Sequence, residues 1–167
     1  ITKATAQLMR DFGSIQSPQN AFYLNVGLET LPLRVERHCQ NALAIAKYLE
    51  KNEKVAWANY ADLPGSSDNE LVKKYLPKGT CGVVSFGIKG DRERSVKFMD
   101  SLKLVSIATH VADSRTCMLH PASHTHRQLT EDQLLEAGVA PDLIRLSVGI
   151  ENVDDLIADL EQGFNKI

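Results

Sequence analysis

The chain has 167 residues, of which 43% are hydrophobic and 24% are charged, the size and composition of a globular unit that can bury a core. Nineteen basic and 21 acidic side chains give a net charge of −2, and this near balance gives no support to a nucleic-acid or anionic-membrane partner. No apolar run approaches the roughly 20 residues of a membrane helix, and three widely spaced cysteines without a C-x-x-C motif indicate reduced thiols in the cytoplasm.

Residues 1–30 predict two helices that act as a connector. The first shows helical apolar spacing as far as Phe12 and ends at Gly13. It begins in mid-pattern without a capping residue, so we expect the chain to be part of a longer protein. The second begins at Ser17, a capping residue followed by proline, and runs to about Leu28. It is apolar on most of its circumference, so we expect it to be buried on several sides.

A third and longer helix is predicted from residues 30–32 to about Lys51. Its apolar positions recur with a period close to 3.6, which is typical of a helix with one buried face. The charged and polar side chains along it predict a solvated or subunit-facing surface. The apolar face is Val35, Cys39, Ala42, Leu43, Ala46 and Leu49, and the surface is Arg34, Glu36, Arg37, His38 and Glu50.

From about residue 55 the pattern predicts the order β-α-β-α-β-β-α-β-α. The fold class is therefore α/β of the α+β type: a small, mainly antiparallel sheet with helices packed on one face. The strands are predicted at 55–58, 82–89, 104–107, 116–119 and 143–150.

Each helix between or after these strands has a start signal. Capping boxes are predicted at 67–70 and 130–133, and Asp91 and Asn152 are predicted N-caps. We expect the helix after Asp91 to direct Val96, Met99 and Leu102 inward.

Two segments carry candidate chemistry. His120, His124 and His126 lie within seven residues, a spacing that could suggest zinc, but no cysteine or carboxylate accompanies them. We therefore expect a structural or active-site loop without a metal.

Arg145 lies on the opposite strand face from Ile144 and Leu146. It is either an arginine on the solvent face or a guanidinium held ready for a carboxylate, which its planar fork suits.

Three common catalytic and binding motifs are absent. The sequence has no G-x-S-x-G elbow, no G-x-G-x-x-G run and no Walker lysine. Serine-hydrolase catalysis and nucleotide binding therefore have no sequence support.

Five segments in order resemble the transsulfuration enzymes, which are pyridoxal-phosphate-dependent enzymes of cysteine and methionine metabolism. Together they span nearly the whole chain, which makes the resemblance specific although each segment alone is weak. They are residues 17–22 (SPQNAF), 27–31 (GLETL), 34–42 (RVERHCQNA), 120–126 (HPASHTH) and 144–151 (IRLSVGIE).

The resemblance implies the C-terminal substrate-binding domain of a fold-type-I enzyme, residues 31–167, preceded by the connector. It places the substrate's α-carboxylate on Arg145, with His110, Val111 and Thr125 as further substrate-binding residues. His110 and Val111 stand where many members have "SLG" or "NVG". The resemblance also implies that the cofactor lysine and the groups that bind the cofactor lie in a missing N-terminal domain, so that this chain holds no catalytic, cofactor or metal residue of its own.

Residues 109–129 resemble the O-acetylhomoserine sulfhydrylases in particular, which make homocysteine from O-acetylhomoserine and sulfide. The resemblance then implies methionine biosynthesis, an amino-acid substrate, pyridoxal phosphate and a homo-oligomer, a homotetramer in this family. Two alternatives stay open: a cystathionine γ-synthase or γ-lyase of the same family, and a stand-alone α+β binding module without catalysis.

Overall fold

The computed structural model describes all 167 residues. They form two compact units, residues 1–33 and residues 34–167, which are described in turn. None of the helices is both long enough and apolar enough to cross a membrane.

The first unit is helical, as predicted. A π-helical segment, η1 (Ala4–Met9), continues into α1 (Arg10–Phe12), which ends at Gly13 with a left-handed φ of 64°. Helix α2 (Pro18–Glu29) begins as predicted, because the hydroxyl of Ser17 accepts the Asn20 N–H at 3.2 Å. The expected burial of α2 is wrong for this chain, since no α2 side chain is buried and Phe22 is 62% exposed.

Helix α3 (Leu31–Lys51) has the predicted bounds within a residue and buries one side. The predicted positions Cys39, Ala42, Ala46 and Leu49 are buried, but Val35 is exposed. His38 is buried as well, so its expected place on a solvated or subunit-facing surface is wrong. The buried face is rotated relative to the predicted one because it includes polar side chains with specific partners.

Five strands form one sheet in the order β1-β2-β5-β4-β3. All neighbours are antiparallel except β3 and β4, which are parallel. This confirms the predicted mainly antiparallel sheet and the predicted order of elements along the chain. The strands are β1 (Val55–Asn59), β2 (Val83–Ile88), β3 (Ser106–Ile107), β4 (Cys117–Leu119) and β5 (Leu143–Ser147).

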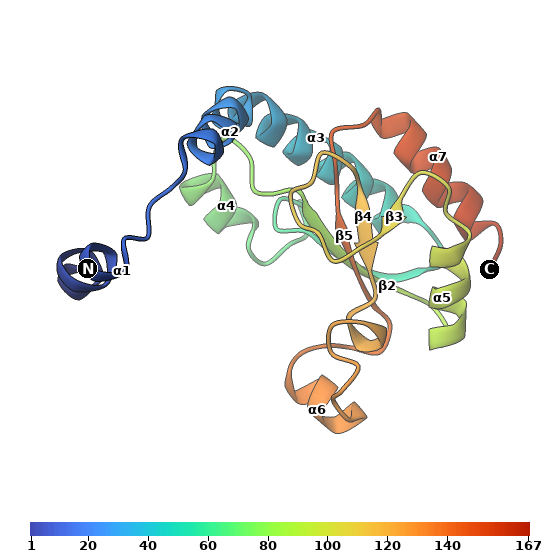
Figure 1. Ribbon diagram of the computed structural model, residues 1–167. Helices are drawn as coiled ribbons and strands as arrows, with labels where there is room; N and C mark the ends of the chain where they lie inside the picture. The colour runs from blue at the N-terminus through green and yellow to red at the C-terminus, as the bar shows by residue number, and fades with distance from the viewer. The chain divides into compact units, whose positions relative to one another are not determined.

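One face of the sheet carries the core. Phe86 and Ile144 are paired across β2 and β5 and are fully buried, as strand parity predicted. Their side chains share one cluster with the buried faces of α3, α5 and α7, the helices grouped with the sheet in Figure 1. Burying each such side chain stabilises the fold by about 1.5–3 kcal/mol, so the helices on one face are held by apolar contact.

The remaining helices are α4 (Asn69–Tyr75), α5 (Arg92–Asp100), η2 (Pro121–Ser123), α6 (Glu131–Glu136) and α7 (Val153–Phe164). The side chains of Asp91 and Asn152 cap α5 and α7, and Thr130 forms a complete capping box with Gln133 on α6. These caps were predicted.

Two local predictions are wrong. The segment 67–70 forms no capping box, because the Asp68 side chain makes no capping bond. In α5, Val96 is 40% exposed and Phe98 is buried in its place. Phe98 stacks on Phe164 of α7 at 4.4 Å between ring centroids, so the partner helix decides which face of α5 turns inward.

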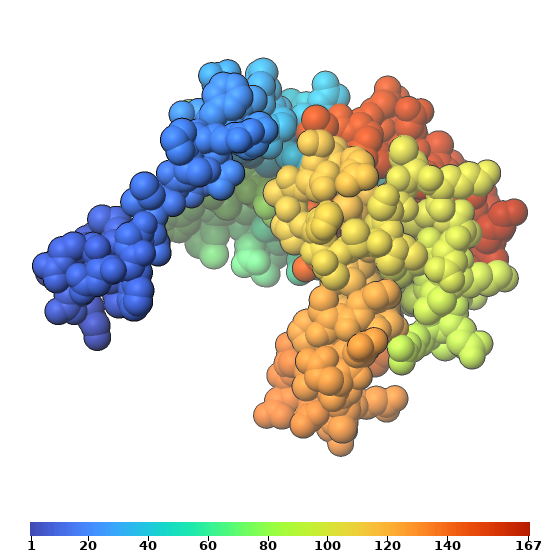
Figure 2. Space-filling model, viewed as in Figure 1, coloured from blue at the N-terminus to red at the C-terminus, as the bar shows by residue number.

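The segment from η2 to α6 forms a separate projection at one end of the sheet, drawn in orange in Figure 2. A second, small apolar cluster holds it together, with Leu134 and Val139 at its centre and Leu143 of β5 packed against it. The segment that carries the three predicted loop histidines is thus joined to the strand that carries Arg145.

Candidate substrate-carboxylate site

The other face of the sheet is open and partly polar. Arg145 of β5 lies on this face and pairs with Ser85 of β2 on one side and Leu119 of β4 on the other. Ser85 pairs in turn with Asn59 of β1. Since neighbouring strands are about 4.8 Å apart, these four residues form one row across the sheet.

A cavity of 440 Å³ lies over this row. Arg145 and Thr125, two of the predicted substrate-binding residues, line it together. Thr125 comes from the loop between η2 and α6, so the cavity joins the open sheet face to the projecting segment. Other lining residues are Asn59, Ser85, Leu119, His126 and Trp57.

Trp57, the only tryptophan of the chain, was not among the predicted site residues. Its indole N–H donates a hydrogen bond to the Asp142 carboxylate at 2.8 Å. The ring lies against Gly87, where an added Cβ would overlap both Trp57 and Asp142. The glycine in β2 therefore lets an aromatic wall form beside the polar row, and only the β1–β2 pairing reveals this.

Arg145 forms no ion pair within the chain. One guanidinium nitrogen, Nη2, donates a hydrogen bond to the Thr109 carbonyl at 3.0 Å. A guanidinium has five N–H donors, so donors remain for a ligand. An arginine fixed at one nitrogen can still bind a carboxylate with two parallel hydrogen bonds.

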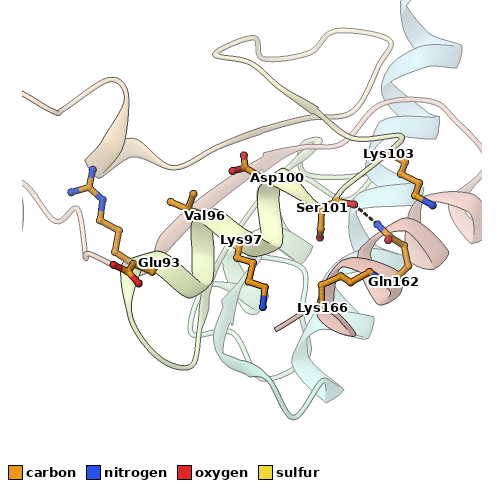
Figure 3. A pocket seen from close by; sticks show the side chains of 9 residues that line it. Glu93, Val96, Lys97, Asp100, Ser101, Lys103, Gln162 and Lys166 are labelled. Carbon is orange, nitrogen blue, oxygen red and sulfur yellow. Dashed lines mark hydrogen bonds between the residues drawn. The ribbon is translucent and has the colours of Figure 1, made fainter.

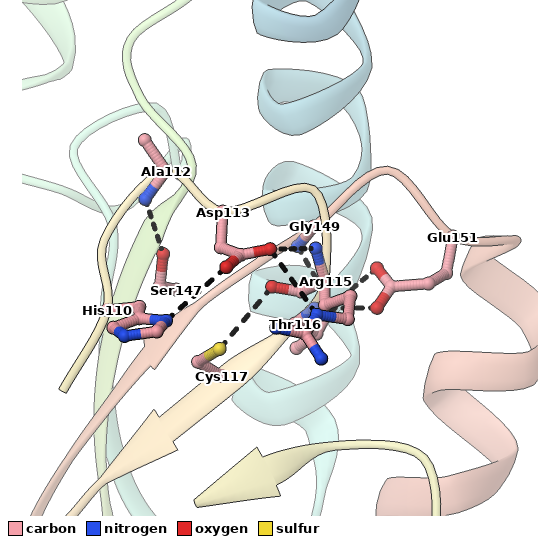
Figure 4. Close-up of polar contacts among 9 residues, drawn as sticks. All are labelled: His110, Ala112, Asp113, Arg115, Thr116, Cys117, Ser147, Gly149 and Glu151. Atoms are coloured by element: carbon pink, nitrogen blue, oxygen red, sulfur yellow. Dashed lines mark hydrogen bonds and ion pairs between the residues drawn. The ribbon is translucent and has the colours of Figure 1, made fainter. Parts of the chain in front are cut away.

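His110 and Val111, the other two predicted residues, do not line the cavity. They follow Thr109, and Val111 is exposed. His110 Nδ1 lies 3.3 Å from the Asp113 carboxylate, as Figure 4 shows. A hydrogen bond from the Arg115 N–H is the main cause that holds the pKa of Asp113 below its usual value. The two residues thus follow directly after Thr109, whose carbonyl accepts the hydrogen bond from Arg145, and their role in substrate binding stays a prediction.

The three loop histidines do not converge, and no group of three metal-binding side chains is present. His120 is buried, and its Nε2–H donates to the Pro141 carbonyl at 2.8 Å. Its Nδ1 therefore accepts the Ser123 hydroxyl at 2.8 Å, and Ser123 accepts the Arg92 Nε–H at 2.9 Å. Burial is the main cause that lowers the pKa of His120. The neutral ring therefore joins Ser123 of η2 to Pro141, which precedes β5.

Two of the resembling segments meet in space. The Nδ1–H of His38 donates to the Val148 carbonyl at 2.6 Å, and the Asn41 amide donates to the carbonyls of Gly149 at 3.0 Å and Glu151 at 2.9 Å. Helix α3 thus fixes the end of β5. Sequence patterns predicted only the two segments, because a contact across more than a hundred residues has no local signal.

A larger cavity of 860 Å³ lies between α5 and α7. Figure 3 shows its exposed charged side chains, with the Gln162 amide donating to the Ser101 carbonyl. These groups include both cations and carboxylates, such as Lys97 and Asp100, and none is a predicted site residue. We therefore place the candidate site at the smaller cavity, where a guanidinium, a hydroxyl and an aromatic wall meet.

The family resemblance implies pyridoxal phosphate held as a Schiff base by a lysine. No lysine lines the Arg145 cavity. The Lys54 amine is bound to the carbonyls of Phe164 and Ile167 at the end of α7, and Lys73 pairs with Glu70 on the surface. That the cofactor site lies outside this chain therefore stays a prediction.

Comparison with known proteins identifies the family. Residues 1–165 match the model of the Cys/Met metabolism PLP-dependent enzymes. An O-acetyl-L-homoserine sulfhydrylase of Leptospira meyeri is 45% identical over 100% of the chain and 38% of its own length. A homocysteine synthase of Schizosaccharomyces pombe is 49% identical over 93% of the chain and 36% of its own length.

Two solved structures of O-acetylhomoserine enzymes resemble this chain in fold and in sequence. A Campylobacter jejuni protein assigned as an O-acetylhomoserine (thiol)-lyase, which contains a pyridoxyl-lysine, superimposes with a TM-score of 0.88 at 40% identity and covers 98% of this chain and 39% of its own. An O-acetylhomoserine sulfhydrylase of Wolinella succinogenes gives a TM-score of 0.81 at 33% identity, over 97% of this chain and 43% of its own. The chain spans about two fifths of these relatives, and it belongs to the family of PLP-dependent enzymes of cysteine and methionine metabolism.

Proposed function

We propose that the protein containing this chain is an O-acetylhomoserine sulfhydrylase, which replaces the acetate of O-acetylhomoserine by sulfide to give homocysteine for methionine biosynthesis. In this proposal the chain supplies the site for the substrate's α-carboxylate. The observation that carries the proposal is Arg145, whose guanidinium borders a cavity and has no carboxylate partner within the chain. The names of the Leptospira meyeri and Wolinella succinogenes relatives support the substrate.

In the proposed site, the residues of this chain bind the substrate's α-carboxylate and orient the substrate. Two parallel hydrogen bonds from Arg145 would hold the carboxylate in one plane. The apolar surfaces of Trp57 and Leu119, which line the same cavity, would reduce competition from water for that ion pair. Thr125 would add a hydroxyl from the neighbouring loop. Bond breaking would belong to the cofactor and to the rest of the protein.

The reaction is tested by a substrate screen on the intact protein. We expect homocysteine to form from O-acetylhomoserine and sulfide. Formation of cystathionine and acetate from O-acetylhomoserine and cysteine, or cleavage of cystathionine, without the sulfide reaction would instead identify a γ-synthase or γ-lyase. The carboxylate site would be the same in each case, since all these substrates are amino acids.

Arg145→Ala in the intact protein is predicted to weaken binding of the amino-acid substrate by about 2–4 kcal/mol, roughly 30- to 700-fold in KM. The reason is the loss of a charge-assisted, two-bond contact. Arg145→Lys should restore little, because an ammonium cannot form both bonds in the plane. Steady-state kinetics with varied amino acid measure both effects.

The cofactor absorbance serves as the control, because we expect the cofactor to be bound elsewhere and its spectrum to survive both substitutions. An unchanged KM in Arg145→Ala would remove Arg145 from the substrate site.

We further propose that the intact protein is a homo-oligomer. The apolar side chains that α2 exposes support this proposal. We also propose that the protein works in the cytoplasm, and the three cysteines without a disulfide support this compartment.

A further inference from the structure

The segment that follows β3 is tied to β5 by two side chains of one strand face. Arg145 donates to the Thr109 carbonyl at 3.0 Å, and the hydroxyl of Ser147 accepts the Ala112 N–H at 3.1 Å. Arg145 and Ser147 are two positions apart, so their side chains lie on the same side of β5. Residues 109–112 therefore run beside this face of the strand.

The second of these contacts holds a backbone conformation that does not persist by itself. Ala112 has a φ of 61° and is the only non-glycine residue with positive φ. The left-handed region is unfavourable for an alanine by about 1–2 kcal/mol, so the surrounding contacts must maintain it. Ser147 is 2% exposed, and its hydroxyl is the partner that fixes Ala112 at this point.

Further contacts anchor the next residues of the segment. The Ile150 N–H donates to the Ser114 carbonyl at 2.9 Å. The Glu151 carboxylate accepts the Thr116 N–H at 2.6 Å and the Thr116 hydroxyl at 2.8 Å. Figure 4 shows the Glu151–Thr116 contacts beside the Ala112–Ser147 pair. The segment is thus held from Ser114 onward, and at its start the Ala108 N–H donates to the Met118 carbonyl at 3.1 Å. Between these two anchors, over residues 110–113, the Ser147 hydroxyl is the hydrogen-bond partner on the sheet.

We infer that Ser147 is a positioning residue for the substrate's carboxylate: it holds residues 109–112 so that the Thr109 carbonyl fixes the guanidinium of Arg145. This inference rests on the proposed role of Arg145. A free arginine side chain must give up much rotamer freedom when it binds a ligand in one plane. A guanidinium already fixed at Nη2 has given up part of it, so pre-organisation increases affinity for the amino acid. Ser147 itself bonds to Ala112 and does not line the cavity.

The test uses the intact enzyme with Ser147→Ala, a substitution that removes only the hydroxyl. We expect the KM for the amino-acid substrate to rise about 3- to 10-fold, the effect of one lost hydrogen bond acting through Arg145. The kcat and the KM for sulfide should stay as in the wild type. In an Arg145→Ala background, Ser147→Ala should change the amino-acid KM no further, since the guanidinium that it positions is gone.

Ser101→Ala is the matched control. The Ser101 hydroxyl also bonds to a backbone group, the Phe98 carbonyl at 2.6 Å, but it lies at the end of α5. We expect all kinetic constants to be unchanged in this variant. A KM that rises in Arg145→Ala but not in Ser147→Ala would overturn the inference and leave the proposed function intact. An equal loss in Ser147→Ala and Ser101→Ala, or a Ser147→Ala loss confined to kcat, would also overturn it. An unchanged KM in Arg145→Ala would overturn both this inference and the proposed role of Arg145, while the substrate screen would still test the reaction.

Discussion

Gly149 lies where β5 ends, against the backbone of the segment that precedes β4. A Cβ at this position would overlap the Ser114 carbonyl, the Thr116 N–H and the carboxylate of Glu151. The Gly149 N–H also donates to the Thr116 hydroxyl at 2.8 Å. Any side chain here would push the segment away from the strand, so the absence of a Cβ is what lets the two backbones close together.

His120 makes a pH-dependent contribution to the stability of the second unit. Burial lowers its pKa in the folded state, whereas in the unfolded chain the pKa is about 6.5. The unfolded state therefore takes up a proton first as the pH falls. The stabilisation is complete above the unfolded pKa and is lost as the pH falls from about 6.5 to the folded pKa, at up to about 1.4 kcal/mol per pH unit.

His120→Gln is predicted to give a flatter dependence of unfolding free energy on pH between about 7 and 5, because glutamine does not titrate. Urea unfolding of the wild type and the variant across this range measures the difference. The neighbouring Arg92 and His124, which lower the pKa of His120, and Asp142, which raises it, are the same in both proteins. Parallel curves for the two proteins would contradict the assignment.

At the scale of the elements, one carboxylate joins α7 to the chain that leads into β3. Asp159 of α7 is 7% exposed. It accepts the backbone N–H groups of Lys103, Leu104 and Val105 at 2.9, 2.9 and 3.0 Å. Three backbone N–H groups in the segment between α5 and β3 thus have a hydrogen-bond acceptor within the protein, where they would otherwise need water. The position of the short strand β3 depends on this contact because the strand has only two residues.

Asp159→Ala is predicted to lower the free energy of unfolding by about 2–4 kcal/mol, since the amides lose a charged acceptor at a partly buried place. Urea unfolding monitored by circular dichroism measures the loss. Asp159→Asn should lose less, because one oxygen remains to accept. Glu161→Ala is the control on the same helix: Glu161 is exposed, and removing a negative charge near the C-terminus of a helix should cost nothing. Equal losses for Asp159→Ala and Glu161→Ala would contradict the proposed role of Asp159.

At the scale of the whole molecule, the 167-residue chain is predicted to be catalytically inert by itself. It contains a candidate carboxylate site but no lysine in that cavity. An ion pair open to solvent contributes at most about 1 kcal/mol, which is too little to hold a free amino acid. Catalysis would need the cofactor site, and the family relatives are more than twice as long as this chain.

The measurement is to incubate the chain with pyridoxal phosphate, reduce with borohydride and map any labelled lysine by mass spectrometry. We expect only substoichiometric, scattered labelling and no turnover of O-acetylhomoserine with sulfide. The intact protein, treated in the same way, is the positive control. A single lysine of this chain labelled stoichiometrically and accompanied by turnover would show that the chain contains its own active site.

Local patterns predicted most of the fold. The order of nine strands and helices after residue 55, the caps at Asp91, Thr130 and Asn152, and the inward face of β5 are confirmed. Periodicity and capping depend on residues within one or two turns, so a single sequence contains the information. The error at Val96 has a different origin, because the contact of Phe98 with Phe164 of α7 overrides the local pattern. At the segment 67–70 a competing local contact is present, since the Asp68 N–H donates to the Ser66 hydroxyl at 3.2 Å.

Local patterns were enough to predict the elements and the buried and open faces of the central strands, and the family resemblance was enough to name Arg145 and Thr125 as candidate substrate-binding residues. That these two residues share a cavity with Trp57, and that His38 is buried against the end of β5, is visible only in the folded chain. These contacts join residues that are far apart in the sequence. Pairing across strands and the contact of α3 with the end of β5 join residues 26 to 110 positions apart, and the strand register and helix packing that bring them together are properties of the assembled fold.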